Sequence, residues 1–169
     1  VQAYRPVAVY LNGVYWGIHN MREKLNEHYI ASHHPVDPDD LDLLENDSII
    51  NLGDAVHYNN LINFLQTQDI TNPDNYEYVS SQMEIDNFIT HQVSQIYFDN
   101  QDWPGNNTKY WRPRTVDGRW RWLLYDTDFG FGIWNPNAYM NNTLAFALEP
   151  YGPGWPNPPR STFMIRTLM

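Results

Sequence analysis

The chain has 169 residues and a formal net charge of −10, with 20 acidic and 10 basic residues. This charge argues against a nucleic-acid partner, because a protein that binds a polyanion needs a basic face. No run approaches the roughly 18 apolar residues of a membrane span, and the absence of cysteine excludes disulfides, thiolate metal sites and a cysteine nucleophile. At this length we expect a single domain.

The first half of the chain predicts one hairpin followed by helices. Two β-rich runs, 4–11 and 14–21, are separated by Asn12-Gly13. This pair is typical of a type I′ turn, because both of its central residues need positive φ. The acidic stretch 37–47 is predicted to be a connector. Apolar residues at helical spacing predict helices over four segments: 23–32, 54–68, 73–81 and 84–98.

The second half predicts another hairpin and then a long irregular segment. A polar loop at 99–107 precedes two strand-like runs, 108–112 and 119–125. After Asp126 the chain is rich in Gly, Asn and Pro, and little regular structure is expected there. Residues 164–169 resemble the start of a helix, so we expect both ends to lie inside a longer protein. The order of elements predicts an α+β domain, with helices packed beside antiparallel hairpins.

The polar loop contains the first candidate site, NQDWPGNN at 100–107. Asp102 and Asn107 are five residues apart in this loop, so both side chains can turn toward one point. An Asp that accepts the proton of an attacking hydroxyl and an Asn oxygen that ligates a metal suit Mg²⁺ and phosphate chemistry. The alternative is an ordinary turn, since Asp, Asn, Pro and Gly are common turn residues.

The second candidate is a pair of carboxylates, Asp126 and Asp128, at the end of an apolar strand and just before two glycines. Residues i and i+2 share a face of a strand, so both carboxylates can hold one hard cation. Placing them together without a cation would be costly. The alternative is a polar strand end that leads into a loop.

The third candidate is a group of basic and aromatic residues in the second hairpin. Strand alternation predicts that Trp120 and Trp122 share one face and that the arginines point to the other. Cations can neutralise phosphate, and an aromatic face can stack on a base or a sugar. A sheet with a tryptophan core face and an arginine solvent face explains most of the group equally well. Its basic members are Lys109, Arg112, Arg114, Arg119 and Arg121.

Three motifs together resemble the CotH family, named for spore coat protein H, a family of atypical secreted protein kinases. They are YRPVAVYLNGVYWGIHNMRE at 4–23, NQDWPGNN at 100–107 and WRWLLYDTDFG at 120–130. The resemblance implies a divergent protein-kinase-like fold, truncated at both ends. The motif-bearing part is 4–132, and the irregular part is 133–169.

The resemblance also implies roles for individual residues. Asp102 is similar to the catalytic-loop Asp of the family, and Asn107 to the metal-binding Asn downstream. Asp126 is similar to the metal-binding Asp of the next strand, with Asp128 as a second ligand. Glu23 matches a family Glu, and the aromatic stacked on adenine is expected to be Trp120 or Trp122. The phosphate-binding basic residue is expected N-terminal to this chain, since Lys24 is a poor substitute for a strand lysine.

The implied activity is transfer of the γ-phosphoryl group of ATP, with Mg²⁺ or Mn²⁺, to Ser or Thr of a surface or coat protein. The implied setting is bacterial and extracellular or at the cell surface, with further domains of the parent chain as partners. Two alternatives stay open at this point. One is a domain that binds or processes carbohydrate, because the chain is acidic and holds 7 Trp and 12 Tyr. The other is a non-catalytic coat or adhesion module of the same fold.

Overall fold

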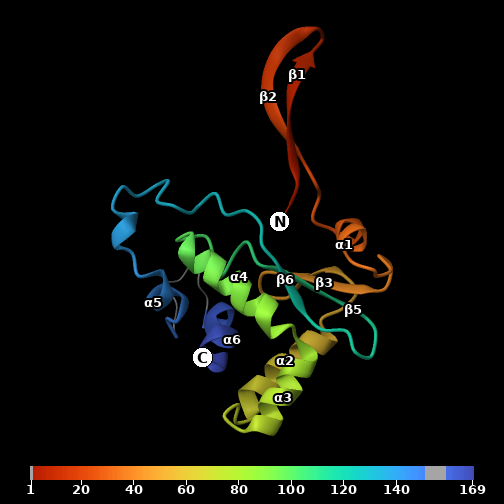
Figure 1. The fold of residues 1–169 in the computed structure, drawn as a ribbon, viewed down its shortest axis with the longest axis vertical. Helices are drawn as coiled ribbons and strands as arrows, with labels where there is room; N and C mark the ends of the chain where they lie inside the picture. The colour runs from red at the N-terminus through yellow and green to blue at the C-terminus, as the bar shows by residue number, and fades with distance from the viewer. Residues whose placement is uncertain (1, 151–158) are drawn as a thin grey trace.

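The computed structural model describes residues 2–150 and 159–169, and side chains in the second segment from 161 onward. It confirms the predicted α+β class, with antiparallel sheets and packed helices. A two-stranded hairpin projects from a body built on a four-stranded sheet (Figure 1).

The projecting hairpin consists of β1 (Tyr4–Leu11) and β2 (Val14–Arg22), paired antiparallel. Asn12 has φ of 50° and Gly13 has φ of 80°, which confirms the predicted turn with positive φ at both central residues. Most side chains of the hairpin are exposed because it extends away from the body (Figure 1).

The sheet of the body has the order β4-β3-β5-β6, and all neighbours are antiparallel. Its outer strands are β4 (Ile49–Leu52) and β6 (Arg121–Leu123), and its inner strands are β3 (Leu41–Glu45) and β5 (Lys109–Pro113). The second hairpin, β5–β6, is therefore confirmed. The connector predicted for 37–47 is wrong, because β3 lies there, at the centre of the sheet.

Helices cover both faces of this sheet. On one face, α1 (Glu27–His33) packs Tyr29 and Ile30 against Leu41, Leu43 and Trp111. On the other face, three helices form the larger core: α2 (Val56–Thr67), α4 (Ile85–Tyr97) and α6 (Pro159–Leu168). A further helix, α3 (Pro73–Gln82), follows α2, so all four predicted helices are present.

Helix α4 is turned differently from what its apolar pattern indicates. Ile89 and Val93 are 51% and 58% exposed, whereas the polar residues His91, Gln92 and Gln95 are buried. Burial lowers the pKa of His91 to about 4, so its imidazole is neutral near pH 7. The buried polar face of α4 leads into the loop that carries Asp102.

The C-terminal part contains more regular structure than expected. A 3₁₀ turn, η1 (Ala138–Met140), and a short helix, α5 (Thr143–Ala147), interrupt the irregular segment. The predicted helix at the end is confirmed by α6, and the irregular structure expected for 151–158 lies outside the described residues. Within 2–150 and 159–169, no helix has the length and apolarity needed to cross a membrane.

Candidate functional site

The loop after α4 and the segment after β6 meet at one side chain. The Nδ2 group of Asn107 donates to Oδ2 of Asp102 at 2.6 Å and to the backbone oxygen of Asp126 at 3.3 Å. Both bonds use the amide nitrogen, so the amide oxygen of Asn107 keeps its lone pairs for another partner. The structure therefore brings together Asp102, Asn107 and Asp126, which are separated in sequence by up to 24 residues.

A second asparagine, Asn100, also stabilises this junction. Asn100 is fully buried, and its Nδ2 group donates to Gln95 of α4 at 2.8 Å and to the backbone oxygen of Asp126 at 3.5 Å. Its side-chain oxygen accepts from the backbone N–H of Asp102 at 3.1 Å. Asn100 was given no role by the sequence, although it begins the motif that contains Asp102.

The backbone is also unusual at two of these residues. Asn107 has φ of 54° and Asp126 has φ of 51°, both in the left-handed region that residues other than glycine rarely adopt. Backbone of this kind persists only where the surroundings hold it, and it gathers at ligand-binding and active sites. Here the hydrogen bonds of Asn100 and Asn107 supply that restraint.

The carboxylates of the site repel one another. The pKa of Asp126 is raised, first by partial burial and then by the charge of Asp128, by a hydrogen bond to it and by the charge of Asp102. Oδ1 of Asp102 is buried and accepts no hydrogen bond. A buried carboxylate oxygen without a partner is costly, and a bound cation would relieve both this cost and the mutual repulsion.

This donor set fits Mg²⁺ on chemical grounds. Magnesium in phosphoryl-transfer sites takes one or two carboxylates and completes its shell with water and phosphate oxygens. In the described part of the chain, no three His, Cys, Asp or Glu side chains are grouped to hold a metal by themselves.

A cleft of about 460 Å³ opens beside the acidic pair. Its lining includes Asp126, Thr127 and Asp128, and the base of the projecting hairpin contributes Tyr4, Asn20 and Arg22, with Gln2 just before it. Phe98, Leu124 and Tyr125 complete the lining. Burial raises the pKa of Tyr125, and the negative charge of Glu45 raises it further, so its hydroxyl stays protonated.

Glu23 lies at the base of the hairpin and does not line this cleft. Its Oε2 accepts from the backbone N–H of Ala3 at 2.8 Å, and its Oε1 lies 3.7 Å from His33 of α1. The second contact joins the base of the hairpin to α1, and the ligand-binding role expected for Glu23 stays a prediction.

The two tryptophans expected near adenine lie in the core. Trp120 is fully buried and its Nε1 group donates to His57 at 3.0 Å, while Trp122 is 5% exposed and stacks on Tyr110. Neither lines the cleft, so neither offers a ring face to a ligand there. The aromatic rings that do line it belong to Tyr4, Phe98 and Tyr125.

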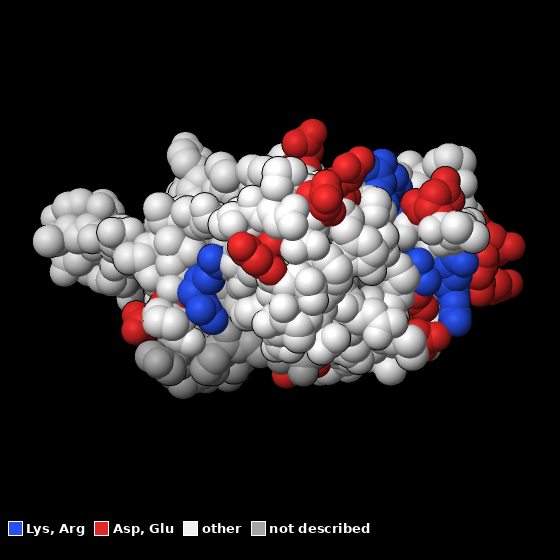
Figure 2. Space-filling model, turned by 90° about the horizontal axis from the view of Figure 1, so that it is seen from below, with Lys and Arg blue, Asp and Glu red and all other residues white. Residues whose placement is uncertain are grey.

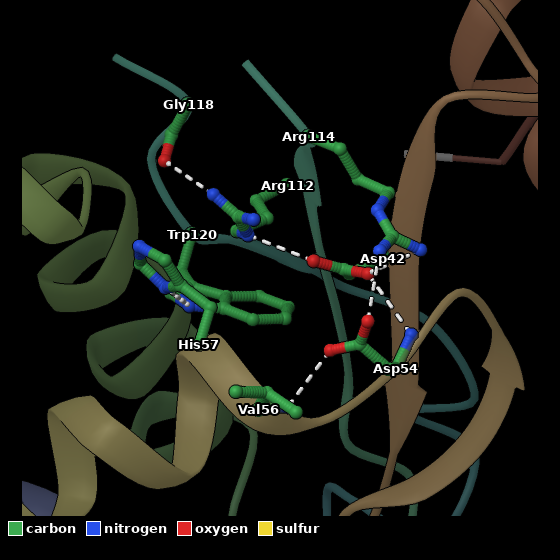
Figure 3. Close-up of polar contacts among 8 residues, drawn as sticks. All are labelled: Asp42, Asp54, Val56, His57, Arg112, Arg114, Gly118 and Trp120. Carbon is green, nitrogen blue, oxygen red and sulfur yellow. Dashed lines mark hydrogen bonds and ion pairs between the residues drawn. The ribbon is translucent and has the colours of Figure 1, made fainter. Parts of the chain in front are cut away.

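The basic residues of the second hairpin are engaged elsewhere. Asp42, which is buried, accepts from Nε of Arg112 at 2.8 Å, and Arg114 donates to Asp54 at 2.8 Å (Figure 3). On the β6 side of the hairpin, Arg119 and Arg121 both pair with Glu84, at 2.7 and 3.1 Å. Lys109 pairs with Glu45 at 3.3 Å. All five cations predicted to help neutralise phosphate are therefore bound to protein carboxylates.

The surface view agrees with this pairing. On the face shown in Figure 2, basic side chains lie next to acidic ones, and most of the remaining surface is uncharged. This face has no broad basic patch of the kind that binds a polyanion, as the net charge predicted.

The comparisons with known proteins agree with the resemblance in the motifs. The family described as CotH kinase protein matches residues 1–169, and the chain therefore belongs to the CotH family. No curated protein and no solved structure matches the chain. The kinase-like function therefore rests on the family and on the geometry of the site.

Proposed function

We propose that this CotH-family chain binds Mg–ATP in the cleft between the hairpin and the end of β6. The γ-phosphoryl group is then transferred to a Ser or Thr hydroxyl of a surface or coat protein. The observation that carries this proposal is the junction at Asn107, which bonds to both Asp102 and Asp126. It ties the carboxylate of Asp102, the proposed proton acceptor, to the backbone of Asp126, the residue whose carboxylate is proposed to bind the cation.

Each residue of the site has a separate role in the proposed reaction. Asp102 accepts the proton of the acceptor hydroxyl through Oδ1, the oxygen that has no partner in the structure. The hydroxyl oxygen forms the new bond to the γ-phosphorus, the bond from that phosphorus to the bridging oxygen breaks, and ADP leaves. Asn106 and Asn107 both donate to Oδ2 of Asp102, at 3.0 and 2.6 Å, and so hold Oδ1 in one direction. Positioning of this kind supplies much of the rate in phosphoryl transfer.

Mg²⁺ would be held by the carboxylate of Asp126 and the amide oxygen of Asn107, with Asp128 as a further ligand. When bound, it supplies the positive charge that the phosphate oxygens need in an acidic cleft. The negative residues of the site alone would repel ATP, so binding of the nucleotide should depend on the divalent cation. Mn²⁺ has similar ligand preferences and should replace Mg²⁺.

The carbohydrate alternative keeps part of its basis. Four tryptophans are buried, namely Trp103, Trp111, Trp120 and Trp122, but Trp16 and Trp134 are 64% and 71% exposed and could stack on a sugar. The non-catalytic alternative is separated from the kinase proposal by experiment, because a fold kept without turnover needs no free proton acceptor at Asp102.

The test is the variant Asp102→Asn, which keeps the size of the side chain and removes the base. Mg–ATP binding should stay close to that of the unchanged protein, while the rate of phosphoryl transfer falls by about 10²–10⁴-fold, the usual contribution of a general base. Transfer is measured by mass spectrometry of Ser and Thr phosphorylation, on the protein itself and on a peptide library. Asp117→Asn, at an exposed residue of the β5–β6 turn, is the matched control and should change neither quantity. A protein that binds Mg–ATP but transfers no phosphate to any acceptor would contradict the kinase proposal in favour of the non-catalytic module.

A further inference from the structure

One face of the projecting hairpin looks into the acidic cleft. Tyr4 pairs with Arg22 and Pro6 pairs with Asn20 in the β1–β2 register. Residues two apart on a strand share a face, so Asn20, Arg22 and Tyr4 lie on the same side of the hairpin. All three line the same cleft as Asp126 and Asp128. The hairpin therefore brings a guanidinium to the one place where the site holds excess negative charge.

Arg22 differs from the basic residues of the sheet because no carboxylate neutralises it. The sheet cations are each paired at 3.3 Å or less. Within residues 2–150 and 161–169, Arg22 makes no ion pair at 4.0 Å or less, and it does not bond to Asp126 across the cleft. Arg22 and Asp126 nevertheless line the same cleft of about 460 Å³, and an anionic group bound in this cleft could contact both sides of the charge pair.

We propose that Arg22 is the phosphate-binding cation of this cleft, a proposal that rests on the proposed Mg–ATP function. A guanidinium presents a planar fork of N–H donors that matches two phosphate oxygens at once, and such bidentate contacts are among the strongest hydrogen bonds in proteins. The bound cation on the Asp126 side and Arg22 on the hairpin side then flank the phosphates from opposite directions. The phosphate-binding group would then lie within this chain, whereas the sequence analysis expected it N-terminal to the chain.

The proposal predicts effects of opposite sign on two ligands. Mg–ATP is attracted by Arg22, so Arg22→Gln should weaken its binding by about tenfold, the loss expected for a hydrogen bond to a charged group. Mn²⁺ alone is repelled by Arg22, so the same variant should bind Mn²⁺ at least as tightly as the unchanged protein. Arg22→Lys keeps the charge but loses the fork, so its affinity for Mg–ATP should lie between the two.

The matched control is Arg5→Gln, which removes the same charge from the same hairpin. Arg5 pairs with Met21 and not with Arg22, so it lies on the opposite face, and it does not line the cleft. Both affinities should be unchanged in Arg5→Gln. The melting temperatures of the unliganded variants are measured alongside, and they should match the unchanged protein because Arg22 has no bonded partner to lose.

Calorimetric titration with Mg–ATP and electron paramagnetic resonance titration with Mn²⁺ give the two affinities. Weaker Mg–ATP binding with undiminished Mn²⁺ binding, in Arg22→Gln only, supports the proposal. If the unchanged protein binds Mg–ATP and Arg22→Gln binds it equally well or more tightly, the assignment of Arg22 is wrong and the proposed function stands. If the unchanged protein itself binds no Mg–ATP, the proposed function fails and the assignment fails with it.

Discussion

The molecule contains two clusters of aspartates that differ in whether their charges are paired. On the inner strand β3, Asp42 is buried but bonded to Arg112, and nearby Asp54 accepts from Arg114 and from a backbone N–H (Figure 3). In the segment after β6, Asp126 stands beside two further carboxylates and forms no ion pair with any described residue.

The difference shows what each cluster is for. Charges that serve only the fold are matched within the fold, because an unmatched buried charge costs several kcal/mol. Gly53 also contributes to the first cluster. It has φ of 69°, and the chain passes so close to Asp42 at this point that an added Cβ would overlap the carboxylate. The second cluster leaves its charge unmatched and one carboxylate oxygen without a partner. In the proposed function, a bound cation would supply the partner that this cluster lacks.

The largest expected effect is on the matched cluster. Asp42→Asn leaves Arg112 partly buried without its counter-charge, so the free energy of unfolding should fall by about 3–5 kcal/mol. The same substitution at the other cluster, Asp126→Asn, removes a repulsion and should leave the unliganded protein as stable or more stable. Urea unfolding followed by circular dichroism measures both values. Equal destabilisation by the two variants would show that the clusters do not differ as described.

A smaller effect is expected on the pH dependence of stability. The folded protein raises the pKa of Asp126 above its ordinary value of 3.8, so between the two values the folded state holds a proton that the unfolded state has lost. The contribution of Asp126 to the free energy of unfolding is therefore greatest at low pH, and it falls as the pH rises through the raised pKa. The side chain is largely exposed, so solvent screening keeps the effect modest.

Melting temperatures in buffers from about pH 4 upward measure this dependence. The curve of the unchanged protein minus that of Asp126→Asn should slope downward with rising pH, and Mg–ATP should remove the slope because the bound cation favours the ionised carboxylate. A difference curve that slopes upward would contradict this expectation, because it would mean that the protein itself stabilises Asp126 as an anion.

The sequence predicted the elements whose signals are local. Asn12-Gly13 defines the turn of the first hairpin, and Asn72 caps α3 through a bond to the N–H of Asp74 at 3.0 Å. Strand β3 was missed because its acidic composition indicates a solvated connector. The residue that neutralises Asp42 lies 70 positions further along the chain, and that compensation exists only in the folded sheet.

Long-range contacts also limited the predictions for helix α4 and for the candidate site. Helix α4 was located correctly, but its buried side is polar, because Gln95 must reach Asn100 and support the loop of Asp102. Asp102, Asn107 and Asp126 were identified from their motifs, and the structure brings them together, while the roles assigned to them stay predictions. Arg22 was overlooked although it stands in the first motif, because only the placement of the hairpin over β6 shows that it faces the acidic pair.

The most direct test of the central claim is the position of a bound cation. Crystals grown with Mn²⁺ and a non-hydrolysable ATP analogue should show an anomalous scattering peak beside the Asp126 carboxylate and the Asn107 amide oxygen, with metal–oxygen distances of about 2.0–2.3 Å. The phosphates should lie between this peak and Arg22. A nucleotide bound elsewhere, or a manganese peak away from Asp126 and Asn107, would contradict the account.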